Sequence, residues 1–145
     1  MKISSKGRYA LRMMIDIAEN SGGLPVTIKD ISERQDISTK YLEQIVTGLT
    51  RANLLRSERG PQGGYMLTKP PKEYSAGQII RAIEGNLAPV ACLADESNQC
   101  ERSSICQTLD FWNGLYRAIE SYVDSVTLQD LLDKKPPPAE LDFSI

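Results

Sequence analysis

Three cysteines, Cys92, Cys100 and Cys106, are the residues of this 145-residue chain whose type and spacing most directly suggest chemistry. Seven residues separate the first two cysteines and five separate the last two, so one loop could bring three thiolates to a single point. Converging thiolates bind iron–sulfur clusters or zinc. Two other interpretations remain: buried thiols that pack as small apolar groups, or a redox pair that forms a reversible disulfide.

The residues around these cysteines favour a metal site. They are mostly polar, which argues against three buried thiols. The chain has no histidine, so a fourth ligand must be a carboxylate, an amide, a small thiol from solution or a residue of a partner subunit. The local candidates are Asp95, Glu96, Glu101, Gln107 and Asp110. Weak oxygen ligation would leave a labile corner, which suits a sensor better than an electron carrier.

A second stretch, residues 37–67, suggests recognition of DNA. Ser38 is a good helix N-cap, and the apolar residues after it recur at three- and four-residue steps: Tyr41, Leu42, Ile45, Leu49 and Ala52. The remaining face carries Thr39, Lys40, Glu43, Gln44, Thr47 and Arg51. Glu can accept a hydrogen bond from cytosine, Gln can pair with adenine, and Lys, Thr and Arg suit phosphate oxygens. This pattern predicts a recognition helix in the major groove.

A β-hairpin is expected directly after this helix, with strands at residues 54–58 and 65–68. Gly60, Pro61, Gly63 and Gly64 permit a tight bend between the strands. Arg59 then lies at the tip, where it could reach the neighbouring minor groove. Helix and hairpin together predict a winged helix-turn-helix.

Two helices should precede the recognition helix. The first runs from Ser4 or Ser5 to about Asn20, and the second, capped by Thr27, ends in a turn at residues 35–37. Four cations crowd the start of the first helix: Lys2, Lys6, Arg8 and Arg12. They could lie beside a DNA backbone, although a solvated basic face is the plainer interpretation.

The second half of the chain predicts a different set of elements. A connector at residues 69–72 leads to a helix with a capping box at Ser75 and Gln78, which ends near Gly85. Residues 86–104 lack periodicity, and a wide apolar stripe then extends from 104 to about 126, with one more capped turn at Thr127. We expect this long helix to be a dimer interface, because paired half-sites on DNA require a two-fold protein; the alternative is a core helix in a monomer.

The expected fold class is therefore mainly α: a winged helix-turn-helix with a small two-stranded β wing plus a long dimerisation helix. Residues 1–72 would bind DNA, residues 73–135 would hold the cysteine loop and dimerisation helix, and residues 136–145 would be a flexible tail. Charge supports the division, since residues 1–72 carry 12 Lys or Arg against 7 Asp or Glu, and residues 73–145 carry 5 against 12.

Several classes of protein are disfavoured. No apolar run approaches the roughly 18 residues that span a bilayer, and the N-terminus lacks the apolar segment of a signal peptide, so we expect a cytoplasmic protein without a membrane partner. With no histidine, no nucleotide-binding loop and no paired-carboxylate motif, nothing assembles a catalytic site, so we do not expect an enzyme.

Three segments, residues 1–10, 38–44 and 59–65, resemble the bacterial Rrf-two family of transcription regulators, which includes the IscR, NsrR and CymR types. The resemblance covers nearly the whole chain. It implies a homodimeric winged-helix repressor or activator that binds a double-stranded DNA operator. The family's recognition residues correspond to Ser38, Lys40, Tyr41, Glu43 and Gln44, and its wing arginine to Arg59.

In cluster-binding members of the family, three cysteines before the dimer helix hold a 2Fe-2S or 4Fe-4S cluster. They correspond to Cys92, Cys100 and Cys106, and we expect 2Fe-2S here. The positions that supply a fourth ligand in two branches hold Leu109 and Arg8 in this chain, so that ligand is unassigned. The leading hypothesis is an IscR-like regulator switched by this cluster. The alternative is a CymR-like repressor of cysteine or sulfur metabolism, controlled by a partner enzyme or by thiol oxidation.

Overall fold

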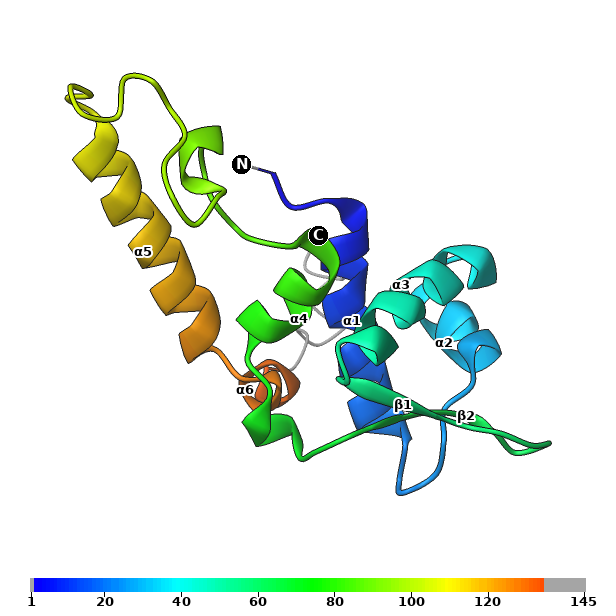
Figure 1. The fold of residues 1–145 in the computed structure, drawn as a ribbon. Helices are drawn as coiled ribbons and strands as arrows, with labels where there is room; N and C mark the ends of the chain where they lie inside the picture. Colours follow the sequence, from blue (N-terminus) through cyan, green and yellow to red (C-terminus); the bar gives the residue numbers. More distant parts are fainter. Residues whose placement is uncertain (1, 135–145) are drawn as a thin grey trace, which may run out of the picture.

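Residues 2–134 are described by the structure, a computed structural model, and they form a mainly helical fold with one two-stranded antiparallel sheet (Figure 1). The helices and strands are α1 (Ser5–Asn20), α2 (Ile28–Gln35), α3 (Thr39–Arg51), β1 (Leu55–Glu58), β2 (Gly64–Leu67), α4 (Ala76–Glu84), α5 (Leu109–Ser125) and α6 (Leu128–Asp133). Short 3-10 turns lie at Pro71–Glu73 (η1) and Ala91–Leu93 (η2). The predicted fold class is confirmed, and the predicted tail at residues 136–145 lies outside the described residues.

Polar caps determine where most of the helices begin. The capping side chains are Ser4 for α1, Thr27 for α2, Ser38 for α3, Ser75 for α4 and Thr127 for α6. Each accepts a hydrogen bond from a backbone N–H that the helix leaves free, an interaction worth about 1 kcal/mol. At Ser75 and Thr127 the residue three positions later bonds back to the cap's own N–H, which completes a capping box.

The turn between α2 and α3 is tight. Asp36 takes the left-handed conformation, with φ of 56°, and its N–H donates to the carbonyl of Ser32. The Ser32 hydroxyl donates to the carbonyl of Ile37 at 2.6 Å, so Ser32 holds the turn through both its carbonyl and its side chain. Asp tolerates this conformation better than most residues. As a result only three residues separate the end of α2 from the start of α3, as a helix-turn-helix requires.

The core lies where α1, α2 and α3 meet, and it includes Met13, Met14, Ile17, Ile31, Leu42, Ile45, Leu49 and Leu55. One part of the predicted apolar face of α3 is wrong. Val46 is buried at 4% exposure, whereas Ala52 is exposed, because α3 ends at Arg51 and Ala52 is its C-cap. The core also contains a charge that the apolar periodicity did not reveal, the carboxylate of Asp16 at 1% exposure.

The wing is fixed to the rest of the domain at two places. At one, Val26 exchanges two backbone hydrogen bonds with Tyr65, of 3.0 and 2.8 Å. Gly64 allows this approach, because a Cβ there would lie 2.5 Å from the carbonyl oxygen of Val26. Since backbone atoms cannot move aside as a side-chain end can, glycine is required at this position.

The other attachment is the hydroxyl of Tyr74, a residue 1% exposed. It donates to the carbonyl of Leu54 at 2.8 Å and accepts from the N–H of Thr68 at 2.8 Å. Strand β1 begins one residue later than predicted, and β2 begins and ends one residue earlier than predicted. The contacts of Tyr74 explain why Leu54 and Thr68 are left out of the ladder. Leu54 and Thr68 bond to Tyr74 at the base of the wing instead of to each other.

The second half of the chain surrounds α1 from the other side. Helices α4 and α6 pack against α1, and α5 packs along α4 (Figure 1). Tyr74, Ile79 and Leu128 contribute to the same core as the first three helices. Helix α5 differs from the others, because none of its residues is buried.

The predicted start of the long helix, at residue 104, is wrong. Helix α5 begins at Leu109, and the chain before it forms turns in which Ser103 bonds to Cys100 and Ile105 bonds to Arg102. Ile105 is 65% exposed, so extending the helix over it would bury no apolar surface. Cys106 therefore lies in the turns that precede α5 and not at the start of the helix.

Candidate nucleic-acid interface and cysteine loop

One face of α3 is entirely polar and open to solvent. Its exposed residues are Thr39, Lys40, Glu43, Gln44, Thr47 and Arg51, the set that the sequence predicts for a recognition face. The opposite face, with Leu42, Ile45 and Leu49, is buried against the core, so the direction in which the polar side chains project is fixed by packing. Ser38 is exposed at the start of this face, and its hydroxyl accepts from the N–H of Tyr41 at 3.2 Å.

Tyr41 differs from the other predicted DNA-binding residues because it also joins α3 to α1. Its hydroxyl lies 2.7 Å from the hydroxyl of Ser5, and its ring meets the ring of Tyr9 edge-on, with centroids 5.7 Å apart. The side chain is half-buried. Tyr41 therefore positions the start of α3, and only part of its surface is free for a ligand.

The cations at the start of α1 are of two kinds. Lys2, Lys6 and Arg8 are exposed, as a backbone-binding surface requires. Arg12 is also exposed, but its Nε donates to Oε1 of Gln35 at 3.1 Å, and its guanidinium lies 5.1 Å from the centroid of Tyr9. Arg12 therefore joins α1 to the end of α2, a structural role that the sequence pattern did not indicate.

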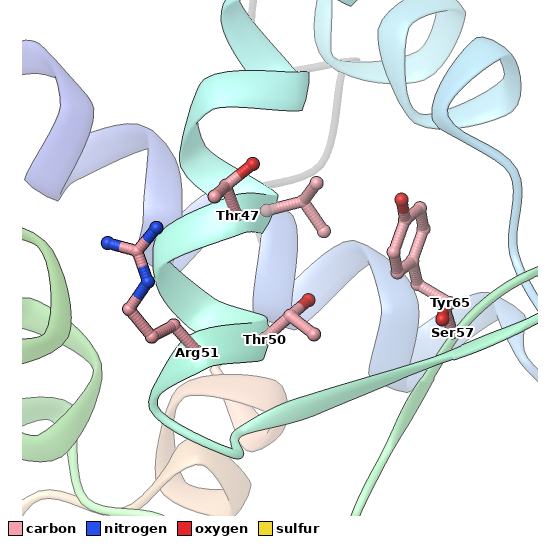
Figure 2. A pocket seen from close by; sticks show the side chains of 6 residues that line it. Thr47, Thr50, Arg51, Ser57 and Tyr65 are labelled. Carbon is pink, nitrogen blue, oxygen red and sulfur yellow. The ribbon is translucent and has the colours of Figure 1, made fainter.

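A cleft of about 450 Å³ separates α3 from the wing. It is lined by Val46, Thr47, Thr50, Arg51, Ser57 and Tyr65. In Figure 2, Thr50 projects from α3 toward the side on which Tyr65 stands, whereas Arg51 leaves the helix on the opposite side. The Thr50, Ser57 and Tyr65 hydroxyls make no hydrogen bond with any residue in the range 2–134, so they are free to donate to a ligand.

Three residues that line this cleft, Thr50, Ser57 and Tyr65, were not predicted as candidate site residues from the sequence. Ser57 and Tyr65 lie opposite each other in the β ladder, so their side chains share one face of the wing. The hairpin register was the signal that could have identified this pair. Arg59, the predicted tip residue, is exposed beyond the end of β1.

The three cysteines are free thiols in the segment between α4 and α5. Cys92, in η2, and Cys106 are half-buried, and Cys100 is exposed. The Sγ of Cys106 lies 3.3 Å from Oγ1 of Thr108, and this hydrogen bond lowers the pKa of the Cys106 thiol. A lower pKa favours the thiolate, which is the form that binds metals.

The three free thiols of the cysteine segment are the donors that could hold a metal. Within residues 2–134 no group of three or more His, Cys, Asp or Glu side chains is placed to bind a metal ion. By donor chemistry the three free thiols fit an iron–sulfur cluster, but in this conformation they do not converge. The hydrogen bonds of the segment are local, such as that from the N–H of Cys100 to Oδ1 of Asn98 at 2.8 Å. The candidate fourth ligands Asp95, Glu96, Glu101, Gln107 and Asp110 are all exposed.

None of the described helices is both long enough and apolar enough to cross a membrane. A helix-turn-helix whose exposed recognition face is flanked by a two-stranded wing defines the winged-helix class of DNA-binding proteins. Comparison with known proteins identifies the branch of that class.

The Rrf2 family model, described as an iron-dependent transcriptional regulator, matches residues 3–134. An HTH-type transcriptional regulator of Haemophilus influenzae is 44% identical over 135 residues, which are 93% of this chain and 89% of that protein. IscR of Pectobacterium atrosepticum is 39% identical over 93% of this chain and 81% of its own length. The solved structure of CymR, the global cysteine regulator of B. subtilis, superimposes with a TM-score of 0.77 at 39% identity, covering 94% of this chain and 99% of CymR. The chain belongs to the Rrf2 family and is a DNA-binding transcriptional regulator, not an enzyme.

Proposed function

We propose that this regulator is a homodimer that binds a specific double-stranded operator and is switched by an iron–sulfur cluster on Cys92, Cys100 and Cys106. The observation that carries the DNA-binding part is the fully exposed polar face of α3 beside the wing. In this proposal residues 1–72 contact the DNA, and residues 73–135 hold the cysteine loop and the dimer helix. Operator binding takes place in the cytoplasm, where bacterial DNA lies.

Helix α3 would lie in the major groove, with Glu43 and Gln44 at base edges and Ser38, Lys40, Tyr41 and Arg51 toward the backbone. Arg59 would enter the adjacent minor groove. One sugar–phosphate strand separates two adjacent grooves, so it would pass between α3 and the wing. The cleft there offers the hydroxyls of Thr50 and Ser57, which have no partner within the described part of the chain and can donate to phosphate oxygens.

A second copy of the chain would cover α5. Phe111 is 64% exposed, Tyr122 is 70% exposed and Leu115 is 37% exposed. Their spacing of four and seven residues places them on one face of the helix. A contiguous apolar face on a helix without buried residues is typical of an interface, and a two-fold dimer presents two recognition helices to paired half-sites.

The cysteine segment connects α4, which packs on α1, to α5, so any change in its conformation acts between these two helices. Relatives named IscR and the iron-dependent description of the family support an iron–sulfur group here. When bound, such a cluster would supply a redox-responsive centre with labile ligation, and the proposal takes it to be 2Fe-2S, held by the three thiols and one weaker ligand. The chain's own part is to bring the three thiols together, which requires segment 86–108 to change conformation relative to the one described.

The cluster is tested by anaerobic purification, followed by an absorption spectrum and by iron and acid-labile sulfide counts. We expect a coloured protein with sulfide near the iron content, and Cys92→Ser, Cys100→Ser and Cys106→Ser variants that lose it. A colourless wild-type protein without iron after reconstitution would refute the cluster and leave the DNA-binding assignment intact. Binding of a duplex selected from random DNA is then compared in the cluster-loaded and cluster-free forms.

The recognition residues are tested on the same duplex. Gln44→Ala and Arg59→Ala should weaken binding, and Glu43→Ala should alter base preference. A variant that loses one phosphate contact should show a slope of log affinity against log salt concentration that is smaller by about one. Glu19→Ala, exposed at the end of α1, is the control. Unchanged affinity and selectivity in all three variants would refute the assignment of the recognition face.

A CymR-like repressor of cysteine metabolism is the second candidate. It is favoured by the likeness to CymR and by three free thiols that do not form a metal site in residues 2–134. It predicts a colourless protein whose DNA binding does not change when iron is added. Its DNA binding would instead be controlled by a stoichiometric partner enzyme or by thiol oxidation. Mass spectrometry of the oxidised protein and affinity capture of the partner distinguish this candidate from the cluster-switched regulator.

A further inference from the structure

Helix α4 lies between the DNA-binding helices and α5 (Figure 1). We propose that Glu84 and Arg81 are positioning residues that hold α4 against both sides, and thereby set the direction of the recognition helix relative to the dimer helix. This inference rests on the proposed function, because in a homodimer that direction determines the spacing of the two recognition helices.

Glu84, the last residue of α4, closes the contact with α1. Its Oε1 accepts from the N–H of Ser4 at 2.9 Å and from the Ser4 hydroxyl. Ser4 is also the N-cap of α1, so this carboxylate holds the first turn of that helix. Gly7 leaves room for it, because a Cβ at this buried position would lie 2.5 Å from Oε1 of Glu84.

The same turn of α4 also meets the recognition helix. A Cβ at Gly48, in α3, would lie 2.9 Å from Cδ1 of Ile83 and 3.5 Å from the carbonyl oxygen of Ala82. Consecutive residues of α4 therefore dock beside glycines on two different DNA-binding helices. One helical turn thus positions α1 and α3 together, and the chain then passes through Gly85 into the cysteine segment.

Arg81 attaches α4 to α5 on the other side. Its two terminal nitrogens donate to the two carboxylate oxygens of Asp124 at 2.7 and 3.1 Å, a bidentate pair with a fixed relative orientation. Glu120 lies 3.8 Å from the same guanidinium. Gly77 permits this contact too, since a Cβ there would lie 2.2 Å from Oδ1 of Asp124. The hydrogen bonds between the two side chains raise the pKa of Arg81 and lower the pKa of Asp124, as expected for an ion pair.

The contact of Glu84 with Ser4 and that of Arg81 with Asp124 lie on different sides of α4, so each can be broken without the other. Glu84→Ala removes the acceptor for Ser4, whereas Glu84→Gln keeps an oxygen there and should restore the contact without the charge. Arg81→Ala removes the bidentate pair with Asp124. Arg117→Ala is its matched control, because Arg117 is exposed on α5 and forms no ion pair with any residue in the range 2–134.

The first measurement uses the full chain without DNA. Spin labels on ketone-bearing residues introduced at Thr47 in α3 and Ser121 in α5, both exposed, avoid the native cysteines. Doubly labelled chains are diluted with unlabelled chains, and pulsed EPR gives the distance distribution within one chain. We expect one narrow distribution for the parent, Glu84→Gln and Arg117→Ala proteins, and a clearly broadened or shifted one for Glu84→Ala and Arg81→Ala.

The second measurement compares binding of the selected full duplex with binding of a duplex holding one half-site. Glu84→Ala and Arg81→Ala should lose about tenfold or more in affinity for the full site, since two misaligned recognition helices lose the advantage of linked binding. Their affinity for the half-site duplex should stay within about twofold of the parent's, which is the variation expected when two sites do not affect each other. Full duplexes lengthened or shortened by one base pair between half-sites should recover part of the lost affinity.

Two results would overturn the inference. One is a narrow, unshifted distance distribution in both Glu84→Ala and Arg81→Ala. The other is an equal loss of half-site and full-site affinity with a lowered melting temperature, which would mean that these residues only stabilise the fold. If the parent protein selects no DNA, the proposed function fails, while the spin-label distances still decide whether α4 positions α3.

Discussion

The guanidinium of Arg34 in α2 binds the buried carboxylate of Asp16 in α1 through three hydrogen bonds of 2.8, 3.0 and 3.3 Å. Asp16 also accepts from Nε2 of Gln35 at 3.0 Å. The pair is unequal, because the side chain of Asp16 is 1% exposed and that of Arg34 is 38% exposed. Hydrogen bonding to Asp16 raises the pKa of Arg34, so the cation persists at any ordinary pH. This contact fixes α2 on α1, and α2 in turn packs against α3.

We predict that removing Arg34 costs more stability than removing Asp16. Arg34→Ala leaves a carboxylate buried without a cation, which typically costs about 3–5 kcal/mol. Asp16→Ala leaves an arginine that reaches water, so only the lost charged hydrogen bonds count, about 1.5–3 kcal/mol. Urea denaturation of both variants measures the difference. Glu33→Ala, exposed on the same helix, should change little, and the reverse order of the two costs would contradict this account.

Tyr74→Phe should loosen the base of the wing. The hydroxyl that is lost satisfies the carbonyl of Leu54 and the N–H of Thr68, and leaving such groups unpaired costs about 1–3 kcal/mol. Amide exchange of Thr68 should accelerate together with the drop in stability. Tyr122→Phe is the matched control, since the hydroxyl of Tyr122 forms no hydrogen bond with any residue in the range 2–134 and the variant keeps the aromatic ring. Equal stability of the two variants would show that the hydroxyl of Tyr74 does not anchor the wing.

The Arg81–Asp124 pair should make a small contribution to stability that depends on pH. Hydrogen bonding to Arg81 lowers the pKa of Asp124 below its ordinary value of about 3.9. The stabilisation is therefore fully present above that ordinary value and is lost as the pH falls through the lower pKa of the folded state. Asp124 is 48% exposed, so we expect less than about 1 kcal/mol.

The measurement is the difference in unfolding free energy between the parent and Asp124→Asn from pH 7 down to pH 3. The difference should be constant above about pH 5 and should shrink below pH 4. The same titration of Glu19→Gln, exposed at the end of α1, serves as the control. A difference that grows as the solution becomes more acidic would have the wrong sign for this pair.

Phe111→Glu should dissociate the dimer. Placing a charge in an apolar seam costs as much as removing a hot-spot residue, at least about 2 kcal/mol, or roughly thirtyfold in the dimer dissociation constant. Sedimentation velocity over a concentration series gives that constant. Leu24→Glu alters a residue of similar exposure, 68%, in the loop after α1 and should leave the dimer intact. Dimers of unchanged strength in Phe111→Glu would place the interface elsewhere.

The sequence by itself determined the parts of the structure that depend on interactions between near neighbours. Caps such as Ser38 and Ser75 bond to N–H groups three residues away, so their effect can be read from a short segment. The amphipathic period of α3 and the glycines of the hairpin act over similarly short distances. For that reason the helix-turn-helix, the wing and the exposed polar face of α3 were predictable.

Only the tertiary structure decided the contacts between residues far apart in the chain. The burial of Asp16 depends on Arg34 in another helix, and the contact of Glu84 with Ser4 spans 80 residues. Helix α5 begins at Leu109 and does not extend back over Ile105, whose side chain is 65% exposed and lies outside the core. Spacing allows the cysteine thiols to meet, but packing decides whether they do, and in this conformation they stay apart. Such contacts form only where packing brings distant elements together, so no local pattern encodes them.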